Sequence, residues 1–122
     1  MSAKQNLYTE TMMYKVKGNI WIEGENGAFI GLGRMKLLER VNELGSITDA
    51  AKSMKMSYRQ AWELIDSMNK QAKNPLVVTS AGGTGGGGTK VTGEGMKVIQ
   101  QYKELLSSFE KFSSEQTKKI EI

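Results

Sequence analysis

Residues 45–69 constrain the fold more than any other segment of this chain, because their pattern is typical of two short helices joined by a tight turn. Ser46 stands three residues before Asp49, and Ser57 stands three residues before Gln60. Both pairs have the capping spacing that marks the start of a helix, where a serine hydroxyl accepts a backbone N–H. The segment therefore predicts a helix-turn-helix.

Helical periodicity adds a first helix to this pair. Apolar residues recur at steps of three and four from Met35 to Leu44, and Gly45 follows as a C-cap. We expect the second helix over about 48–54 and the third from Ser57 or Tyr58 to about Lys73, where Asn74 and Pro75 stop it. The three helices together predict a trihelical core.

The third helix has one apolar and one polar face. The apolar positions are Ala61, Leu64, Ile65, Met68 and Ala72. The outward positions are Arg59, Gln60, Glu63, Asp66, Ser67 and Lys70. We expect Trp62 to pack in the core, since duplex DNA does not expose bases on which an indole could stack.

A glycine tract at 82–88 separates two β-branched runs at 76–79 and 89–92, which predicts a hairpin with a long tip. The tract contains the spacing G-x-G-x-x-G, but the strand that follows it excludes a dinucleotide fingerprint, which must open a helix. Thr89 before Lys90 excludes a phosphate-binding Walker motif, which needs glycine at that place. A hairpin over 76–92 after a helix-turn-helix is typical of the wing of a DNA-binding domain.

The segment before the helices predicts a second, smaller hairpin. Residues 1–13 lack a sustained period and are expected to be a flexible tail. Period two from Tyr14 to Ile22 predicts a strand, and an Asn-Gly turn within 24–27 leads to a partner at 28–30. Trp21 falls on the polar face of that strand, so we expect it to pack against a neighbouring element.

Residues 94–112 predict a long amphipathic helix. Its apolar residues are close to a heptad seam, and we expect them to form a dimer interface because one trihelical core cannot cover such a helix along its full length. They are Val98, Ile99, Tyr102, Leu105, Leu106, Phe109 and Phe112. Residues 113–122 are expected to be a frayed tail, so that 14–112 form one domain.

Composition narrows the function classes. The net charge is +4, and residues 46–73 carry five Lys or Arg against three acids, which favours a polyanionic partner. The chain has no Cys and no His, which excludes disulfides, thiolate sites and His-based triads. We therefore expect no enzyme activity, cofactor or metal. No apolar run is long enough for a signal peptide or a membrane span, so a cytoplasmic location is expected.

The sequence resembles the N-terminal DNA-binding domain of ModE-type molybdate-responsive regulators, which is itself similar to the winged helix of LysR-type regulators. The resemblance runs from about Lys17 to Tyr102. It rests on Phe29-Ile30-Gly31-Leu32-Gly33-Arg34, Gly45-Ser46-Ile47, Ala50-Ala51, Met56-Ser57-Tyr58-Arg59-Gln60-Ala61-Trp62, Met68-Asn69, Pro75-Leu76-Val77, the 83–88 tract and Thr92-Gly93-Glu94-Gly95.

Two departures limit what the resemblance implies. Lys55 stands where the turn commonly has glycine, and this costs about 1 kcal/mol if the position needs a positive φ. The family's C-terminal molybdate-binding region has no counterpart in these residues, so we expect no molybdate binding by this chain.

The helix-turn-helix geometry assigns roles to the outward residues. Arg59 and Gln60, in the first turn of the third helix, are placed to reach base edges in the major groove. The hydroxyl-bearing residues and Lys90 of the wing are placed to contact DNA phosphates. The candidate DNA-binding set is Thr48, Ser57, Tyr58, Arg59, Gln60, Glu63, Thr89 and Lys90.

The sequence thus predicts a mainly α protein with small β elements: a winged helix-turn-helix with an N-terminal hairpin and a long C-terminal dimerisation helix. The expected function is sequence-specific binding of duplex DNA by a homodimer that regulates transcription. The principal alternative is a winged-helix module that binds protein, with 14–30 as a docking edge. A weaker one is a nucleotide-binding or catalytic role for the glycine tract.

Overall fold

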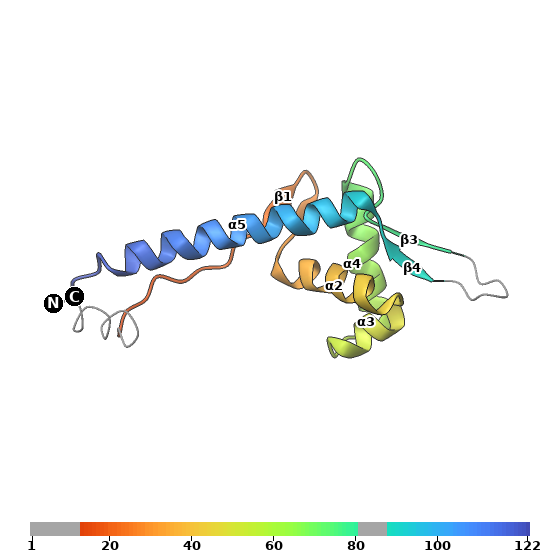
Figure 1. Ribbon diagram of the computed structural model, residues 1–122, viewed down its shortest axis with the longest axis horizontal. Coiled ribbons are helices and arrows are strands. Elements are labelled where there is room, and N and C mark those ends of the chain that lie inside the picture. The colour runs from red at the N-terminus through yellow and green to blue at the C-terminus, as the bar shows by residue number, and fades with distance from the viewer. Residues whose placement is uncertain (1–12, 81–87) are drawn as a thin grey trace. The chain divides into compact units, whose positions relative to one another are not determined.

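The computed structural model describes residues 13–80 and 88–122 (Figure 1). Its contacts divide the chain into two compact units, whereas the sequence predicts one domain over 14–112. One unit is Trp21–Lys103, and the described residues of the other are 13–20 and 104–122. Within the described ranges, no helix has the length and apolarity that a membrane span requires. The predicted tail at 1–13 lies outside the described residues except for Met13, which is exposed.

The N-terminal hairpin is shorter than its sequence pattern predicts. Strand β1 (Ile22–Gly24) pairs antiparallel with β2 (Gly27–Ile30). Gly27 has a φ of 113°, a conformation that favours glycine, which explains the Asn-Gly pair at the turn. A strand from Tyr14 to Ile22 is therefore wrong: β2 has four residues and can pair with no more of the chain that precedes the turn.

Helices α2 (Leu32–Leu44), α3 (Ile47–Ser53) and α4 (Tyr58–Gln71) form the trihelical core, close to the predicted bounds. Gly45 caps α2 with a φ of 67°, and Ser46 accepts the N–H of Asp49 at 3.1 Å. Ser57 likewise accepts the N–H of Gln60 at 3.0 Å. The capping spacings thus correctly located both helix starts. The largest fully buried side chains of this unit are Tyr102, Ile30, Leu37, Leu38, Met68, Leu76 and Val41.

The turn between α3 and α4 is left-handed at Lys55, whose φ is 55°. The backbone N–H groups of Met54 and Met56 both donate to the carbonyl of Ala51, at 3.0 Å, so the turn is held by the end of α3. This conformation disfavours any residue with a Cβ, and it confirms that the position needs a positive φ.

The wing strands β3 (Val77–Thr79) and β4 (Thr89–Val91) pair antiparallel, and most of the glycine tract lies outside the described residues. The Asn69 side chain fixes the base of this hairpin to α4. Its Oδ1 accepts the N–H of Leu76 at 2.8 Å and that of Val77 at 3.2 Å, while its Nδ2 donates to the Val77 carbonyl at 3.0 Å. One carboxamide therefore sets the position at which the wing leaves the core.

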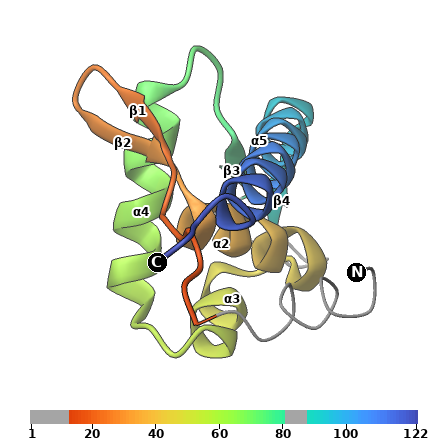
Figure 2. The same cartoon turned by 90° about the vertical axis from the view of Figure 1, so that its left-hand side faces the viewer.

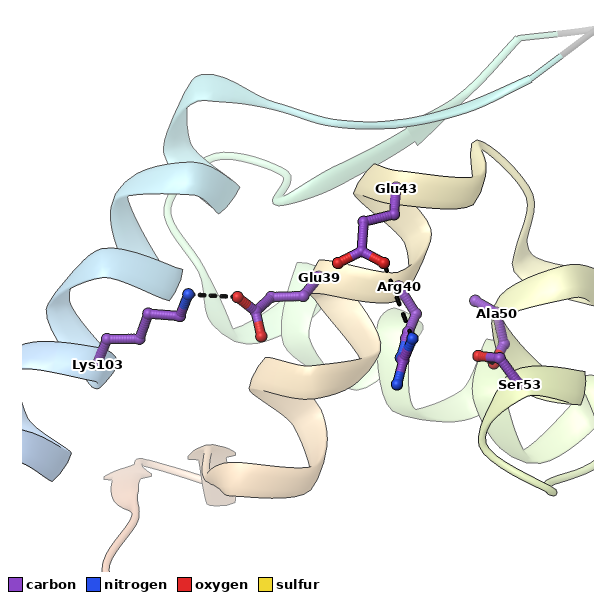
Figure 3. A network of polar contacts seen from close by, with 6 residues as sticks. All are labelled: Glu39, Arg40, Glu43, Ala50, Ser53 and Lys103. Carbon is purple, nitrogen blue, oxygen red and sulfur yellow. Dashed lines mark hydrogen bonds and ion pairs between the residues drawn. The ribbon is translucent and has the colours of Figure 1, made fainter.

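Helix α5 (Gly93–Thr117) runs five residues further than the predicted 94–112, so residues 113–117 are helical and not frayed. Thr92 caps its start, since its hydroxyl accepts the N–H of Gly95 at 3.0 Å. Near Lys103 the helix is tied to α2 by an ion pair with Glu39 (Figure 3). On α2 itself, Arg40 pairs with Glu43 at 3.8 Å.

Three residues predicted to form the dimer interface are core residues of the protomer. Val98, Ile99 and Tyr102 are buried within Trp21–Lys103, so they present no surface to a partner. Burial raises the pKa of the Tyr102 phenol, because it disfavours the phenolate. The periodicity correctly predicted an apolar face, but the first turns of that face are used inside the domain.

Candidate nucleic-acid interface

The first turn of α4 presents polar side chains to solvent. The Arg59 side chain is 88% exposed, and Gln60 is also exposed. Arg59 Nε donates to Glu63 Oε1 at 3.1 Å, one helical turn further on. An exposed ion pair of this kind contributes about 0–1 kcal/mol, so the guanidinium can exchange its partner at small cost.

A shallow hollow of about 230 Å³ brings together three of the predicted contact residues: Thr48 of α3, Tyr58 of α4 and Thr89 of the wing. The wing is joined to the helix-turn-helix beside this hollow, because the N–H of Thr89 donates to the Gly45 carbonyl at 3.1 Å. The hollow therefore has walls from both parts of the motif. Its lining is Gly45, Ser46, Ile47, Thr48, Tyr58, Thr79, Ser80, Gly88 and Thr89.

Most of that lining carries hydroxyl groups. Ser46, Thr79 and Ser80 were not among the sequence candidates, although they lie beside Thr48 and Thr89 in the hollow. Hydroxyls are common donors to DNA phosphate oxygens. The strand register of the wing hairpin could have added Thr79 to the candidate contact residues, because Thr79 pairs with Thr89 across the hairpin.

Lys90 does not line the hollow. It is exposed on β4 and pairs with Val78, between the positions of Thr89 and Val91. Successive side chains of a strand point to opposite faces, so Lys90 and Thr89 serve different surfaces. The structure thus separates the two wing residues that the sequence analysis grouped.

Among the exposed charged residues of the motif that form no ion pair within the described part of the chain, the basic ones are in excess, with Asp49 as the acid among them. On α4, Lys70 is paired with Asp66 at 2.9 Å, and Arg59 with Glu63. Lys52 and Lys55, in α3 and its turn, are exposed and form no ion pair with any residue that the structure describes. No group of three or more metal-ligating side chains lies among the described residues.

Trp62 does not pack in the core, contrary to the prediction from the sequence. It is 47% exposed and therefore not a core residue. Each residue of an α-helix is rotated by about 100° from the last, so Trp62 is turned well away from the buried Ala61. Ile65 and Met68, which return to the direction of Ala61, complete the buried face. The lack of exposed bases in duplex DNA favoured a core position for Trp62, but the phase of the helix excludes it.

The outer flank of α4 also holds the N-terminal hairpin, which lies beside it (Figure 2). Arg34 Nη1 donates to the Ala28 carbonyl at 3.0 Å and to Ser67 Oγ at 3.1 Å, and Gln71 Nε2 donates to the same carbonyl at 2.9 Å. Sequence reasoning missed this cluster, although Arg34 ends a motif that it used. The cluster braces α4 against β2.

No protein-family model matches the chain. It is 42% identical over 84 residues, 69% of its length, to the molybdenum transport protein ModE of Azotobacter vinelandii. It is 38% identical over 81 residues, 66% of its length, to the transcriptional regulator ModE of Haemophilus influenzae. It is 41% identical over 69 residues, 57% of its length, to the DNA-binding transcriptional dual regulator ModE of Escherichia coli. The chain spans 31%, 32% and 26% of these relatives' own lengths.

Among solved structures, a LysR family transcriptional regulator is similar, with a TM-score of 0.51 and 17% sequence identity. The match covers 66% of this chain and 26% of that one. At this identity the likeness shows the fold, which is a winged helix.

Proposed function

We propose, from the premise that the chain is a homologue of ModE regulators over the segment that it shares with them, that it binds duplex DNA sequence-specifically and regulates transcription. The observation that carries the proposal is the exposed first turn of α4, which stands next to a hydroxyl-lined hollow shared with the wing. A helix-turn-helix places such a turn in the major groove.

Base recognition is assigned to three side chains of α4. Arg59 has the paired donors that fit guanine O6 and N7, and the Gln60 amide fits adenine N6 and N7. Glu63 acts through Arg59, because it holds the guanidinium on the exposed face in the free protein. The Glu63 carboxylate can also accept a hydrogen bond from the exocyclic amine of cytosine.

Phosphate contacts are assigned to the hollow and the wing. Thr48, Tyr58 and Thr89 converge on one depression of about 230 Å³, which has room for a phosphate group. The Ser57 hydroxyl accepts the N–H of Gln60 at the cap of α4 and can donate its own hydrogen to a phosphate oxygen, and Lys90 adds a cation on the other face of β4. Such contacts set the register of the protein on DNA and make its affinity depend on salt.

A homodimer through the C-terminal part of α5 is the second element of the proposal. Leu105 is 40% exposed and Phe112 is 54% exposed, and they stand seven residues apart, hence on one face. The Phe109 ring lies beside them, with its centroid 6.4 Å from that of Phe112, but it is half-buried and does not belong to the exposed pair. Leu106 and Phe109 instead line a groove with residues 15–19 of the same unit. Two joined copies would favour a palindromic DNA site.

Selection of bound sequences from random duplex DNA tests the proposal. Enrichment of one sequence family by the parent protein supports it, and the same selection with Arg59→Ala should relax one position of that family. Failure to enrich any sequence would leave the winged helix as a protein-binding module. Molybdate binding is not part of the proposed function, and its absence stays a prediction.

A further inference from the structure

Trp62 is an exposed aromatic residue in the middle of the proposed recognition helix. Its indole N–H has no hydrogen-bond partner in the part of the chain that the structure describes. Tyr58 stands one helical turn before it and is 53% exposed, so the two rings share a flank of α4. Burying more of either ring would be favourable, so stability does not explain why about half of each ring is exposed.

The flank that carries Trp62 differs chemically from its neighbour. Arg59 and Glu63 are adjacent to Trp62 on the helix, but they pair with each other at 3.1 Å. The exposed surface of α4 thus includes a charged ridge and, next to it, an aromatic flank. The charged ridge suits the hydrogen-bonding edges of bases, whereas the aromatic flank needs an apolar group.

The major groove offers one such group, the C5-methyl of thymine. We propose that Trp62 is a specificity-determining residue whose indole face covers a thymine methyl, with Tyr58 on the same flank. The inference rests on the proposed DNA binding and deepens it, because it names an apolar base contact beside the polar contacts of Arg59 and Gln60. Stacking on a base is not required, since the methyl group projects into the groove.

Uracil substitution tests this contact, because it removes the methyl group and keeps every hydrogen-bonding group of thymine. In the selected duplex, each thymine is replaced in turn and the dissociation constant of the parent protein is measured. One or two positions should weaken binding by about fourfold, which is the loss expected for one methyl group. In Trp62→Ala the same positions should show no penalty.

Trp21 provides the matched control, because it is the other tryptophan of the chain and is also exposed. It lies before β1, where its Nε1 donates to Glu23 at 2.7 Å. Trp21→Phe should keep the uracil penalty. In that variant Trp62 is the sole tryptophan, so its fluorescence should change on binding the thymine duplex and change less with the uracil duplex.

Two results would overturn the inference. One is a uracil penalty of the same size in the parent and in Trp62→Ala, and the other is the absence of any thymine position at which the parent senses the methyl group. If the parent binds duplex DNA in either case, the proposed function stands and the inference alone fails. If the parent binds no duplex at all, both are overturned.

Discussion

Arg59 and Glu63 form an exposed ion pair on the outer face of α4, with Nε and Oε1 3.1 Å apart. The pair keeps the guanidinium on the helix surface in the free protein and is weak enough to yield to a base edge. Arg59→Ala should therefore cost about 1–3 kcal/mol of specific binding and relax preference at one base position. The free energy of unfolding should change by less than about 0.5 kcal/mol.

Arg40→Ala is the control for this prediction, because Arg40 is also an exposed arginine in an ion pair within one helix, at 3.8 Å from Glu43. It should leave both affinity and sequence preference unchanged. An unaltered preference in Arg59→Ala would remove the base contact from the account.

Dimerisation is tested on the exposed face of α5. Leu105→Glu combined with Phe112→Glu should give a folded monomer, because both side chains are exposed in the protomer and their replacement leaves its core intact. Sedimentation should show the mass of a monomer. The variant should also bind a palindromic site more weakly than the parent, because each copy then binds its half-site alone.

The matched control places the same charges at the same spacing on another face, as Ser107→Glu with Ser114→Glu. Both serines are exposed, and this variant should remain a dimer. A parent that sediments as a monomer would show that the apolar face has no partner of its own kind.

Gly95 should tolerate no side chain. A Cβ there would collide with the carbonyl oxygen of Leu76 and with Val91 Cγ1, the latter at 2.6 Å. Gly95→Ala should lower the free energy of unfolding by about 1–3 kcal/mol, the usual cost of overpacking. Gly93→Ala is the control: a Cβ at Gly93 meets nothing within 4 Å, so denaturant unfolding should show no loss. Equal stability of the two variants would contradict the close approach of α5 to the wing.

Lys55→Gly should stabilise the protein, because Lys55 holds a φ of 55° in the turn of the motif. Removing the Cβ from a left-handed position should raise the free energy of unfolding by about 1–2 kcal/mol. The greater conformational entropy of glycine in the unfolded chain should lower it by about 0.5–1 kcal/mol, so the net effect is stabilising. Thermal or denaturant unfolding measures the difference. Lys52→Gly within α3 should have the opposite sign, and stabilisation by both variants would show that strain at Lys55 is not the cause.

Capping signals in the sequence predicted where the helices of the trihelical core begin and where α2 ends. Ser46, Ser57 and Gly45 cap the helices as expected, since capping depends on one side chain or one φ angle. Tertiary assignments were less predictable. The period of α5 could not say whether Tyr102 faces its own core or a second copy, because core and interface positions are equally apolar in sequence.

In the candidate site too, the features set by local pattern were predictable and those set by tertiary contacts were not. The exposure of Arg59 and Gln60 followed from the phase of α4, and the structure agrees. The hollow that joins Thr48, Tyr58 and Thr89 depends on where the wing crosses the motif, which the Asn69 and Gly45 contacts decide. The Gly45–Thr89 hydrogen bond joins residues that are far apart in sequence, so no local pattern contains it.

Fluorescence anisotropy of two labelled duplexes distinguishes sequence-specific from non-specific binding of duplex DNA by this protein. One duplex carries the selected site and the other a scrambled sequence of equal length and composition, and each is titrated at several salt concentrations. The selected duplex should bind at least about 10³-fold more tightly than the scrambled one, and both affinities should fall as the salt concentration rises. Equal affinities for the two duplexes, or no binding to either at low salt, would contradict sequence-specific binding.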